Sequence, residues 1–261
     1  MVNERWDRQA MTTYRAETST GSFADEFRAG AESANPHING EYLRRNPGWH
    51  AGSSEWKAGE ILKMLDRHKL EPKAIGEVGC GVGEVLRHLQ LRMPADREFW
   101  GWDIAPHAID LAKPKENDRL HFELADVLDI DTPPLDLMLV LEVVDHIEDY
   151  FTFLRQLKER SRYQLFHFSL DLSVQNALRS RALLEQRDTY VHLHYFNKET
   201  MLRTLEETGY DVLDYVYTPF GVQFADGRGR FVKPFRQLFF RINPDFAVRV
   251  LGGYRLLVLT R

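Results

Sequence analysis

The stretch IGEVGCGVGEVL, residues 75–86, decides how the rest of the chain is interpreted. It holds four glycines within eight positions, at 76, 79, 81 and 83, and one acid, Glu77, between the first two. Glycine adopts backbone conformations with positive φ and lets a ligand approach the main chain closely. An acid at the same place repels an anion and pairs with a cation. The stretch therefore predicts a turn that receives a positively charged ligand group, and the alternative is a tight turn without a ligand.

Repeated strand and helix patterns surround this turn. Short apolar runs are typical of buried strands, and they occur at 74–78, 99–102, 120–124, 135–141 and 163–168. Helical patterns lie between them at 85–91, 106–112 and 151–158. Parallel neighbouring strands need crossovers of about a dozen residues, so the alternation predicts a parallel sheet with helices on both faces. Ligands of such sheets bind at the carboxyl ends of the strands, where the glycine turn lies.

The end of the chain departs from this rhythm. A helix is expected to begin after Asn197 and to stop at Gly209, and strands are expected near 211–217 and 252–260. Because no strand–helix–strand crossover separates these strands, we expect them to pair antiparallel. The expected fold class is therefore α/β, a doubly wound, Rossmann-like, seven-stranded sheet. It is mostly parallel, with a C-terminal antiparallel strand pair and with helical N-terminal and inserted lid elements.

The chain is expected to have two parts. Residues 1–53 combine polar residues and glycine with spaced aromatic residues, too many for simple disorder. We expect them to form a helical and loop extension that covers the acceptor site. Residues 54–261 are expected to form the ligand-binding domain, with insertions at about 170–195 and 219–253. Its first helix is predicted to begin at the serine pair 53–54, since serine is a preferred N-cap.

The composition is that of a globular protein, with 43% apolar and 28% charged residues in a chain of 261. A net charge of −5 disfavours nucleic acid and anionic membranes as partners. The single cysteine, Cys80, excludes an intramolecular disulfide and suits a reducing compartment. The N-terminus is polar, and no run of about 18 apolar residues occurs. We expect a cytoplasmic protein whose oligomeric state stays open, a homodimer being one option.

The glycine turn differs from one that binds a dinucleotide. Its glycines follow a G-x-G-x-G order, whereas the dinucleotide fingerprint has its third glycine where Glu84 stands. A carboxylate there, like that of Glu77, disfavours a pyrophosphate. Two further acids end the next two predicted strands. Asp103 is suited to accept hydrogen bonds from ribose hydroxyls, and Asp126 from an adenine amino group. Each could also be a helix cap or a turn residue.

In these motifs the chain resembles the class I S-adenosylmethionine-dependent methyltransferases. The resemblance covers residues 54–261 and rests on EVGCGVG, WGWDIAP, ELADVLD, LDLMLVLEVVDHIED and HYFNKETMLRTLEETGYDVLDY. It implies S-adenosyl-L-methionine as the cofactor, with its amino-acid part at the glycine turn, its ribose after the second strand and its adenine after the third. The residues thus implied to bind the cofactor are Glu77, Gly79, Cys80, Gly81, Asp103, Ile104, Asp126, Val127, Leu141 and Glu142.

The methyl acceptor is expected to be a small molecule, a sugar or another biosynthetic metabolite, with an anionic group as one option. Acceptor pockets of this fold are generally built from additions to the domain. The candidate acceptor-binding residues of this chain are Tyr42, Trp49, Trp56, His194, Tyr195, Arg228 and Arg230. Arginine pairs bidentately with phosphate or carboxylate, and aromatic faces can contact a sulfonium. Core packing of the aromatic residues and a solvated basic face are the alternatives.

A hydroxyl or carbon acceptor needs a base for its proton, whereas an amine needs little help. Candidates for that base are His146, His167, Asp171, His192, His194 and Tyr195. Of the residues near the strand ends, we expect His146, Asp145 and His167 to be catalytic. No metal ion is expected, because His192 and His194 lack a carboxylate at companion spacing.

Three alternatives stay open. The same chemistry could act on RNA or protein, although the net charge and the lack of an RNA-binding module disfavour it. The chain could bind S-adenosyl-L-methionine as a non-catalytic partner subunit. It could be a nicotinamide dehydrogenase, which Glu77 and Glu84 disfavour.

Overall fold

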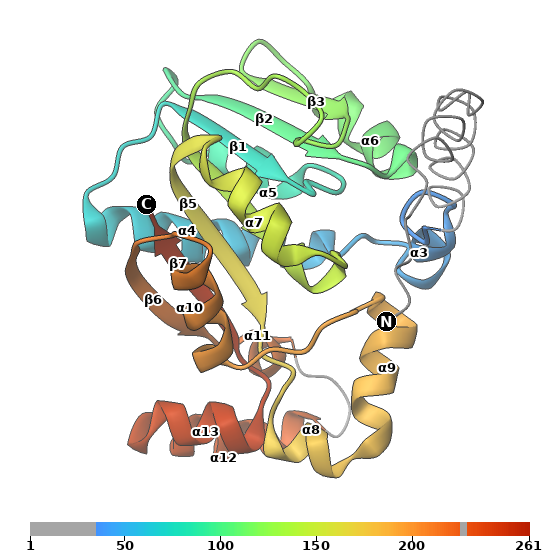
Figure 1. The fold of residues 1–261 in the computed structure, drawn as a ribbon, viewed down its shortest axis with the longest axis vertical. Coiled ribbons are helices and arrows are strands. Elements are labelled where there is room, and N and C mark those ends of the chain that lie inside the picture. The colour runs from blue at the N-terminus through green and yellow to red at the C-terminus, as the bar shows by residue number, and fades with distance from the viewer. Residues whose placement is uncertain (1–34, 225–228) are drawn as a thin grey trace, which may run out of the picture.

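The computed structural model describes residues 35–224 and 229–261, and its centre is a seven-stranded sheet (Figure 1). The strands are β1 (Ala74–Val78), β2 (Glu98–Asp103), β3 (Leu120–Leu124), β4 (Leu135–Leu141), β5 (Ser161–Ser169), β6 (Val212–Thr218) and β7 (Arg255–Thr260). Their order is β3-β2-β1-β4-β5-β7-β6. β1 to β5 are parallel, and β7 lies antiparallel between β5 and β6. The predicted fold class is confirmed.

Helices cover both faces of the sheet, because the strands are apolar on both sides. The helices of one face are α4 (Ser54–His68), α5 (Glu84–Gln90) and α6 (Pro106–Ala112), and those of the other are α7 (Tyr150–Lys158) and α10 (Lys198–Glu207). Along β4, Leu137 and Leu139 pack toward the first group, and Met138 and Val140 toward the second. Successive strand residues point to opposite faces, so cover on both faces requires the continuous apolar run that predicted this strand.

Side-chain caps fix the ends of several helices. Asn197 caps α10 as predicted, in a reciprocal capping box with Thr200. The predicted serine cap of α4 is wrong in one respect. α4 begins at Ser54, but the Ser53 hydroxyl donates to the carbonyl of His50 and leaves the helix amides alone. The chain at His50 has positive φ, and this bond stabilises the turn that enters α4.

The two predicted insertions form one helical group beyond the end of β5 (Figure 1). Its helices are α8 (Val174–Leu178), α9 (Ser180–Tyr190), α11 (Phe220–Gln223), α12 (Gly229–Ile242) and α13 (Pro244–Leu251). The remaining short elements are α3 (Glu41–Arg45), η1 (Ala51–Ser53), η2 (Lys113–Lys115) and η3 (Val144–His146). The side-chain amide of Asn46 donates to the carbonyl of Thr189 over 2.9 Å, and this bond ties the segment after α3 to α9.

Some expectations fall outside the described residues. These are the structure of residues 1–34 and the placement of Arg228. Within 35–224 and 229–261, every helix is too short or too polar to cross a bilayer.

Gly83 offers a test of the glycine turn. Its φ is 75°, and a Cβ on it would overlap the ring of Phe122. We expect Gly83→Ala to lower the free energy of unfolding by about 2–5 kcal/mol, the sum of left-handed strain and overpacking. Urea denaturation measures this. Gly48→Ala is the matched control, since a Cβ there meets no atom within 4 Å. Equal effects of the two changes would contradict the predicted role of Gly83.

Candidate active site

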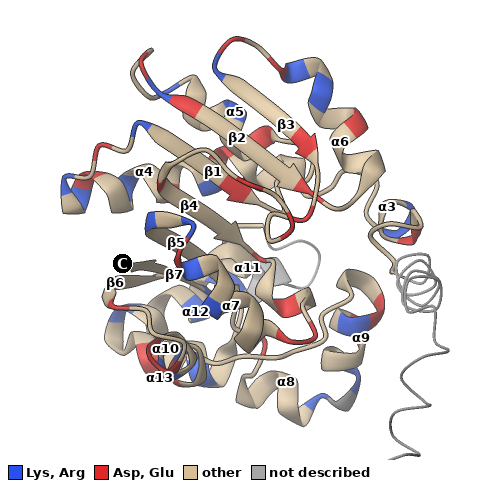
Figure 2. Ribbon diagram, turned by 45° about the horizontal axis from the view of Figure 1, so that its top comes forward, with Lys and Arg blue, Asp and Glu red and all other residues tan. Residues whose placement is uncertain are grey.

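A cavity of about 490 Å³ opens at the carboxyl ends of β1, β2, β4 and β5. Its wall comes from the glycine turn, from residues 35–57, and from the segments that follow β4 and β5. Acidic residues end β2 and lie near the end of β1, as Figure 2 shows. The first part of α11 and the chain around β7's first residue complete the wall. The cavity therefore joins the predicted ligand turn to the additions that were expected to bind an acceptor.

Asp103 holds the glycine turn in place. One of its carboxylate oxygens accepts a hydrogen bond from the amide of Gly81 over 2.8 Å, and the other accepts from Ala105 over 2.8 Å. Cys80 is joined to β2 by its amide, which donates to the carbonyl of Trp102. Burial raises the pKa of the Asp103 carboxyl, while the bonds from Ala105 and Gly81 act in the opposite direction. The end of β2 thus braces the turn after β1 and places a carboxylate at the cavity.

Glu77 presents an unsatisfied acid to the cavity. Its side chain is 2% exposed, and Oε2 accepts no hydrogen bond from any described residue. Burial raises the pKa of the Glu77 carboxyl to about 8, although the charge of Lys57 lowers it. Buried polar atoms nearly always have a partner, so this oxygen is suited to a donor brought by a ligand. The ammonium group of S-adenosyl-L-methionine is such a donor, and the residues present fit the amino-acid part of that cofactor.

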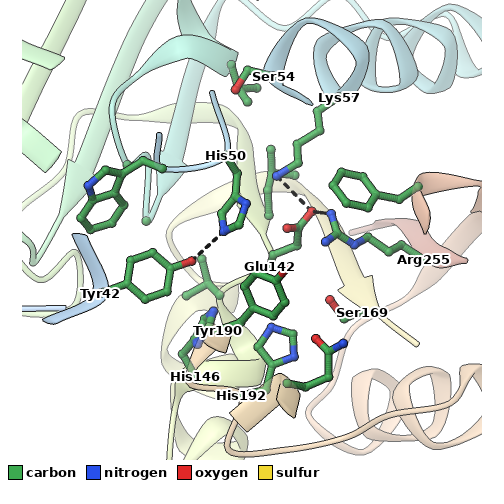
Figure 3. Close-up of a pocket in the computed structure, with 18 of the residues that line it drawn as sticks. Tyr42, His50, Ser54, Lys57, Glu142, His146, Ser169, Tyr190, His192 and Arg255 are labelled. Atoms are coloured by element: carbon green, nitrogen blue, oxygen red, sulfur yellow. Dashed lines mark hydrogen bonds and ion pairs between the residues drawn. The ribbon is translucent and has the colours of Figure 1, made fainter. Parts of the chain in front are cut away.

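Glu142, at the end of β4, is the centre of an ionic cluster. Nζ of Lys57 lies 3.0 Å from its Oε1, and Arg255 binds the same oxygen (Figure 3). Nδ1 of His167 lies 3.1 Å from that oxygen. Burial acts to raise the pKa of Glu142, but Arg255, Lys57 and His167 hold it well below its ordinary value. Its φ of 61° is rare for a residue with a side chain. Such strain clusters at functional sites, where surrounding bonds maintain it.

A group of histidines and tyrosines lines part of the cavity. Its members are His37, Tyr42, His50, His146, Tyr190 and His192, several of which are drawn in Figure 3. The ring centroids of His146 lie 5.0 Å from His37 and 5.1 Å from His192. Burial lowers the pKa of His37 to about 4 and that of His146 to about 3. Both imidazoles are therefore neutral near pH 7, and burial disfavours their protonated forms.

Many of the residues predicted from the sequence lie together at this cavity. Those that line it are Glu77, Gly79, Cys80, Gly81, Asp103, Ile104, Leu141, Glu142, Tyr42, Trp49 and His146. Those that lie outside its lining are Asp126, Val127, Asp145, His167, Trp56, His194 and Tyr195. Arg230 lies in α12 and its side chain is outside the description.

Local partners explain why several of these side chains lie outside. Asp126 accepts a hydrogen bond from the amide of Leu128, within its own loop. The hydroxyl of Tyr195 donates to the carbonyl of Leu183, and His194 bonds the carbonyl of Ile147. The ring of Trp56 packs on the aromatic residues 220 and 224.

His167 and Asp145 are buried behind the cavity wall. His167 is 3% exposed, and its ring nitrogens bond Glu142 over 3.1 Å and Thr218 over 2.8 Å. Neither nitrogen is left to take a proton from an acceptor, so the position of His167 suits orientation of Glu142. Asp145 is fully buried, and burial raises the pKa of its carboxyl to about 7. Among the described residues, no three His, Cys, Asp or Glu side chains are placed to share one metal ion.

Several cavity residues carried no signal that singled them out. They are Asn35, His37, Lys57, Ser169, Tyr190 and Arg255. Arg236 also lines the cavity, and it belongs to the same basic segment, 228–241, as the candidates Arg228 and Arg230. Asp171 and His192 line it too, and both were among the candidates for a base.

Comparisons with known proteins agree with this fold. A family model described as a methyltransferase domain matches residues 49–215. No match was found among the curated proteins. The chain resembles magnesium protoporphyrin IX methyltransferase of Synechocystis PCC 6803 with bound S-adenosylhomocysteine. The two share 14% identity with a TM-score of 0.53, and the match covers 79% of this chain and 83% of the other.

Two further solved structures are similar. One is a chain from the complex of the Haloferax volcanii Trm112 methyltransferase activator with a methyltransferase. It has 14% identity and a TM-score of 0.59, and the match covers 87% of this chain and 96% of that chain. The N-methyltransferase NodS of Bradyrhizobium japonicum WM9 has 16% identity and a TM-score of 0.50, and the match covers 78% of this chain and 85% of that chain. These likenesses show the fold, while the family match spans more than half of the chain. The protein belongs to the S-adenosyl-L-methionine-dependent methyltransferase family, and S-adenosyl-L-methionine is its cofactor.

Proposed function

We propose that the protein transfers a methyl group to a small molecule, a sugar or another biosynthetic metabolite, bound in the same cavity as the cofactor. The size and the lining of that cavity carry the proposal. Residues 35–53 and α9 line it together with the glycine turn, and they are tied by the bond from the Asn46 side chain to the carbonyl of Thr189. The volume of about 490 Å³ falls in the range of small-molecule sites, roughly 300–1,000 Å³. Residues 35–53, the described part of the predicted extension 1–53, would then cover the acceptor site.

The residues near the strand ends would hold the cofactor. Glu77 would accept hydrogen bonds from its ammonium group, and Asp103 from its ribose. S-adenosyl-L-methionine supplies a methyl group on a positively charged sulfur, already activated for transfer. The protein's main task is therefore to position the acceptor, an effect worth up to about 7–11 kcal/mol in the best cases.

A cavity imidazole would take the proton of a hydroxyl acceptor. Within the described residues four histidines line the cavity, and a neutral imidazole has a lone pair that can accept a proton. Base catalysis of this kind typically contributes about 100- to 10,000-fold.

An anionic group on the acceptor would bind Arg236. No described carboxylate lies within ion-pair distance of this guanidinium, although it lines the cavity, and its buried Nε has no partner there. Lys57 and Arg255, by contrast, are both paired with Glu142. Arginine is suited to bind phosphate or carboxylate through two parallel hydrogen bonds.

We expect Arg236→Gln to raise KM for the acceptor at least about tenfold while kcat changes little, since a hydrogen bond to a charged group contributes about 1.5–3 kcal/mol. Steady-state kinetics with the identified acceptor measures this. Arg249→Gln is the control, because Arg249 lies on α13, pairs with Glu199 and is outside the cavity lining. An unchanged KM in the Arg236 variant would contradict the anion site.

The proposed function is tested by following a tritium-labelled methyl group. The protein is incubated with labelled S-adenosyl-L-methionine and a cell extract that has been divided by ultrafiltration. We expect label in molecules that pass the membrane. Label in retained RNA or protein would favour a macromolecular acceptor. Cofactor binding without transfer to either fraction would favour a non-catalytic partner subunit.

A further inference from the structure

The cavity histidines differ in what holds their rings. Within the described part of the chain, four histidines line the cavity, at positions 37, 50, 146 and 192. Of these four rings, His192 alone is hydrogen bonded to a carboxylate. Its Nδ1 lies 2.8 Å from Oδ2 of Asp171. An ionised carboxylate can only accept, so Nδ1 carries the proton and the neutral ring has its lone pair on Nε2.

We propose that His192 is the general base of the methyl transfer, with Asp171 as its positioning residue. The proposal rests on the proposed function and names the residue that serves it. The acceptor oxygen forms a bond to the methyl carbon while the carbon–sulfur bond breaks, and that electron pair stays on sulfur. The acceptor proton moves to Nε2 of His192. The resulting imidazolium is stabilised by the carboxylate of Asp171 and later loses its proton to water.

The other three histidines are held in ways that disfavour this role. Nδ1 of His146 donates to the carbonyl of Val191 over 3.1 Å, and a carbonyl stabilises an imidazolium less than a carboxylate does. His50 is hydrogen bonded through Nε2 to the hydroxyl of Tyr42 over 3.0 Å. Nε2 of His37 has no partner among the described residues, and burial lowers the pKa of that ring to about 4.

The chain around His192 is firmly held. The amide of Leu193 donates to the carbonyl of Asp145 over 2.8 Å, and the amide of Leu172 donates to Phe196 over 3.0 Å. These bonds join the segment after α9 to η3 and to the end of β5. The amide group of Asn176 donates to the Asp171 carbonyl over 2.9 Å. His192 is 6% exposed, so the pair is arranged before any ligand arrives.

The charges that face His192 come from several elements. Burial acts to lower its pKa, but the hydrogen bond to Asp171 and the charges of Asp145 and Asp171 raise it, and Arg255 opposes them. The ring centroids of Tyr190 and His146 lie 5.8 and 5.1 Å from that of His192, and the charge of His192 acts to lower the pKa of His50. The net pKa lies above the ordinary 6.5, whereas those of His37 and His146 are far below it. A base works best with a pKa near the working pH.

The first test needs no acceptor. Nitrogen-15 spectra of histidine-labelled protein report the protonated ring nitrogen and the pKa of each histidine. We expect His192 to carry its proton on Nδ1 and to titrate above 6.5. Asp171→Asn should lower that pKa. A proton on Nε2 of neutral His192, or a His192 pKa that is unchanged in Asp171→Asn, would exclude Asp171 as the positioning residue of His192.

The second test uses the acceptor that tritium labelling identifies. We expect His192→Gln to lower kcat about 100- to 10,000-fold, while calorimetry finds its affinity for S-adenosyl-L-methionine unchanged. Wild-type kcat should rise with pH through the pKa of His192, and Asp171→Asn should move that rise to lower pH. His121→Gln is the matched control, because His121 is an exposed histidine on β3 outside the cavity lining, and it should keep wild-type kcat.

Different results would overturn the base assignment and the proposed function. If wild-type protein and His192→Gln transfer methyl groups at the same rate, the base assignment is overturned and the proposed function stands. If wild-type protein labels no small molecule, the proposed function is overturned, and the base assignment with it.

Discussion

Glu77→Gln is expected to stabilise the protein and to weaken cofactor binding. The Glu77 carboxyl ionises near 4.5 in the unfolded chain but only near pH 8 in the fold, because it is buried. Folded protein therefore holds a proton that unfolded protein loses, and stability falls as pH rises from 4.5 to 8. The loss is at most about 5 kcal/mol. Glutamine has no charge to bury, so the variant should be free of this loss.

Urea denaturation of the cofactor-free protein at pH 6 and pH 9 measures this effect. The stability advantage of Glu77→Gln should be larger at the higher pH. Glu98→Gln is the control, because this exposed acid begins β2 at the end of the sheet opposite the cavity. Its stability should match that of the wild type at both values. An advantage of Glu77→Gln that does not grow with pH would contradict the raised pKa.

Cofactor binding should change in the opposite direction. Loss of a hydrogen bond to a charged group removes about 1.5–3 kcal/mol, which weakens binding about 10- to 150-fold. Near pH 7, wild-type protein should also release a proton from Glu77 as the ammonium group binds. Calorimetry in buffers of different ionisation enthalpy detects that proton. Glu77→Gln should release no proton from this position. Equal cofactor affinity and equal proton release in both proteins would exclude Glu77 as the partner of the ammonium group.

Asp103→Ala is expected to give the second large effect. The change removes the predicted partner of the ribose hydroxyls and both backbone hydrogen bonds, to Gly81 and Ala105. We expect S-adenosylhomocysteine to bind about 10- to 150-fold more weakly, equivalent to about 1.5–3 kcal/mol. Asp103→Asn keeps one acceptor oxygen and should lie between the alanine variant and the wild type.

Calorimetric titration with S-adenosylhomocysteine measures both Asp103 variants. Asp110→Asn is the matched control, since this exposed acid lies on α6 outside the cavity lining. Affinity in Asp103→Ala equal to that of the control would show that the end of β2 does not hold the cofactor.

The sheet could be predicted because its strands are marked locally. β1, β3 and β4 begin and end where their apolar runs do. A strand covered on both faces must be apolar at nearly every position, so its burial is visible in the sequence. The insertion of β7 between β5 and β6 was not visible, because strand order at the end of a sheet depends on contacts across long distances in the chain.

The cofactor side of the cavity was predicted better than the acceptor side for a similar reason. Glu77 and Asp103 stand at strand ends, and in parallel sheets such ends meet at one edge. Lys57 and Arg255 reach Glu142 from distant parts of the chain, and an ion pair leaves no local pattern. The basic run at 228–241 drew attention to Arg228 and Arg230, and the arginine of this run whose described side chain lines the cavity is Arg236. Which side of a helix faces a cavity depends on how the helix is packed.

A crystal structure with bound S-adenosylhomocysteine would test the central claim, that one cavity holds the cofactor and the acceptor. We expect its amino group within hydrogen-bond distance of the Glu77 carboxyl and its ribose hydroxyls within that distance of Asp103. Its sulfur should face the side of the cavity lined by His146, Tyr190 and His192. Electron density for the ligand outside this cavity, or with its ribose at Glu77 and its amino group at Asp103, would show that these residues do not bind the cofactor in this way.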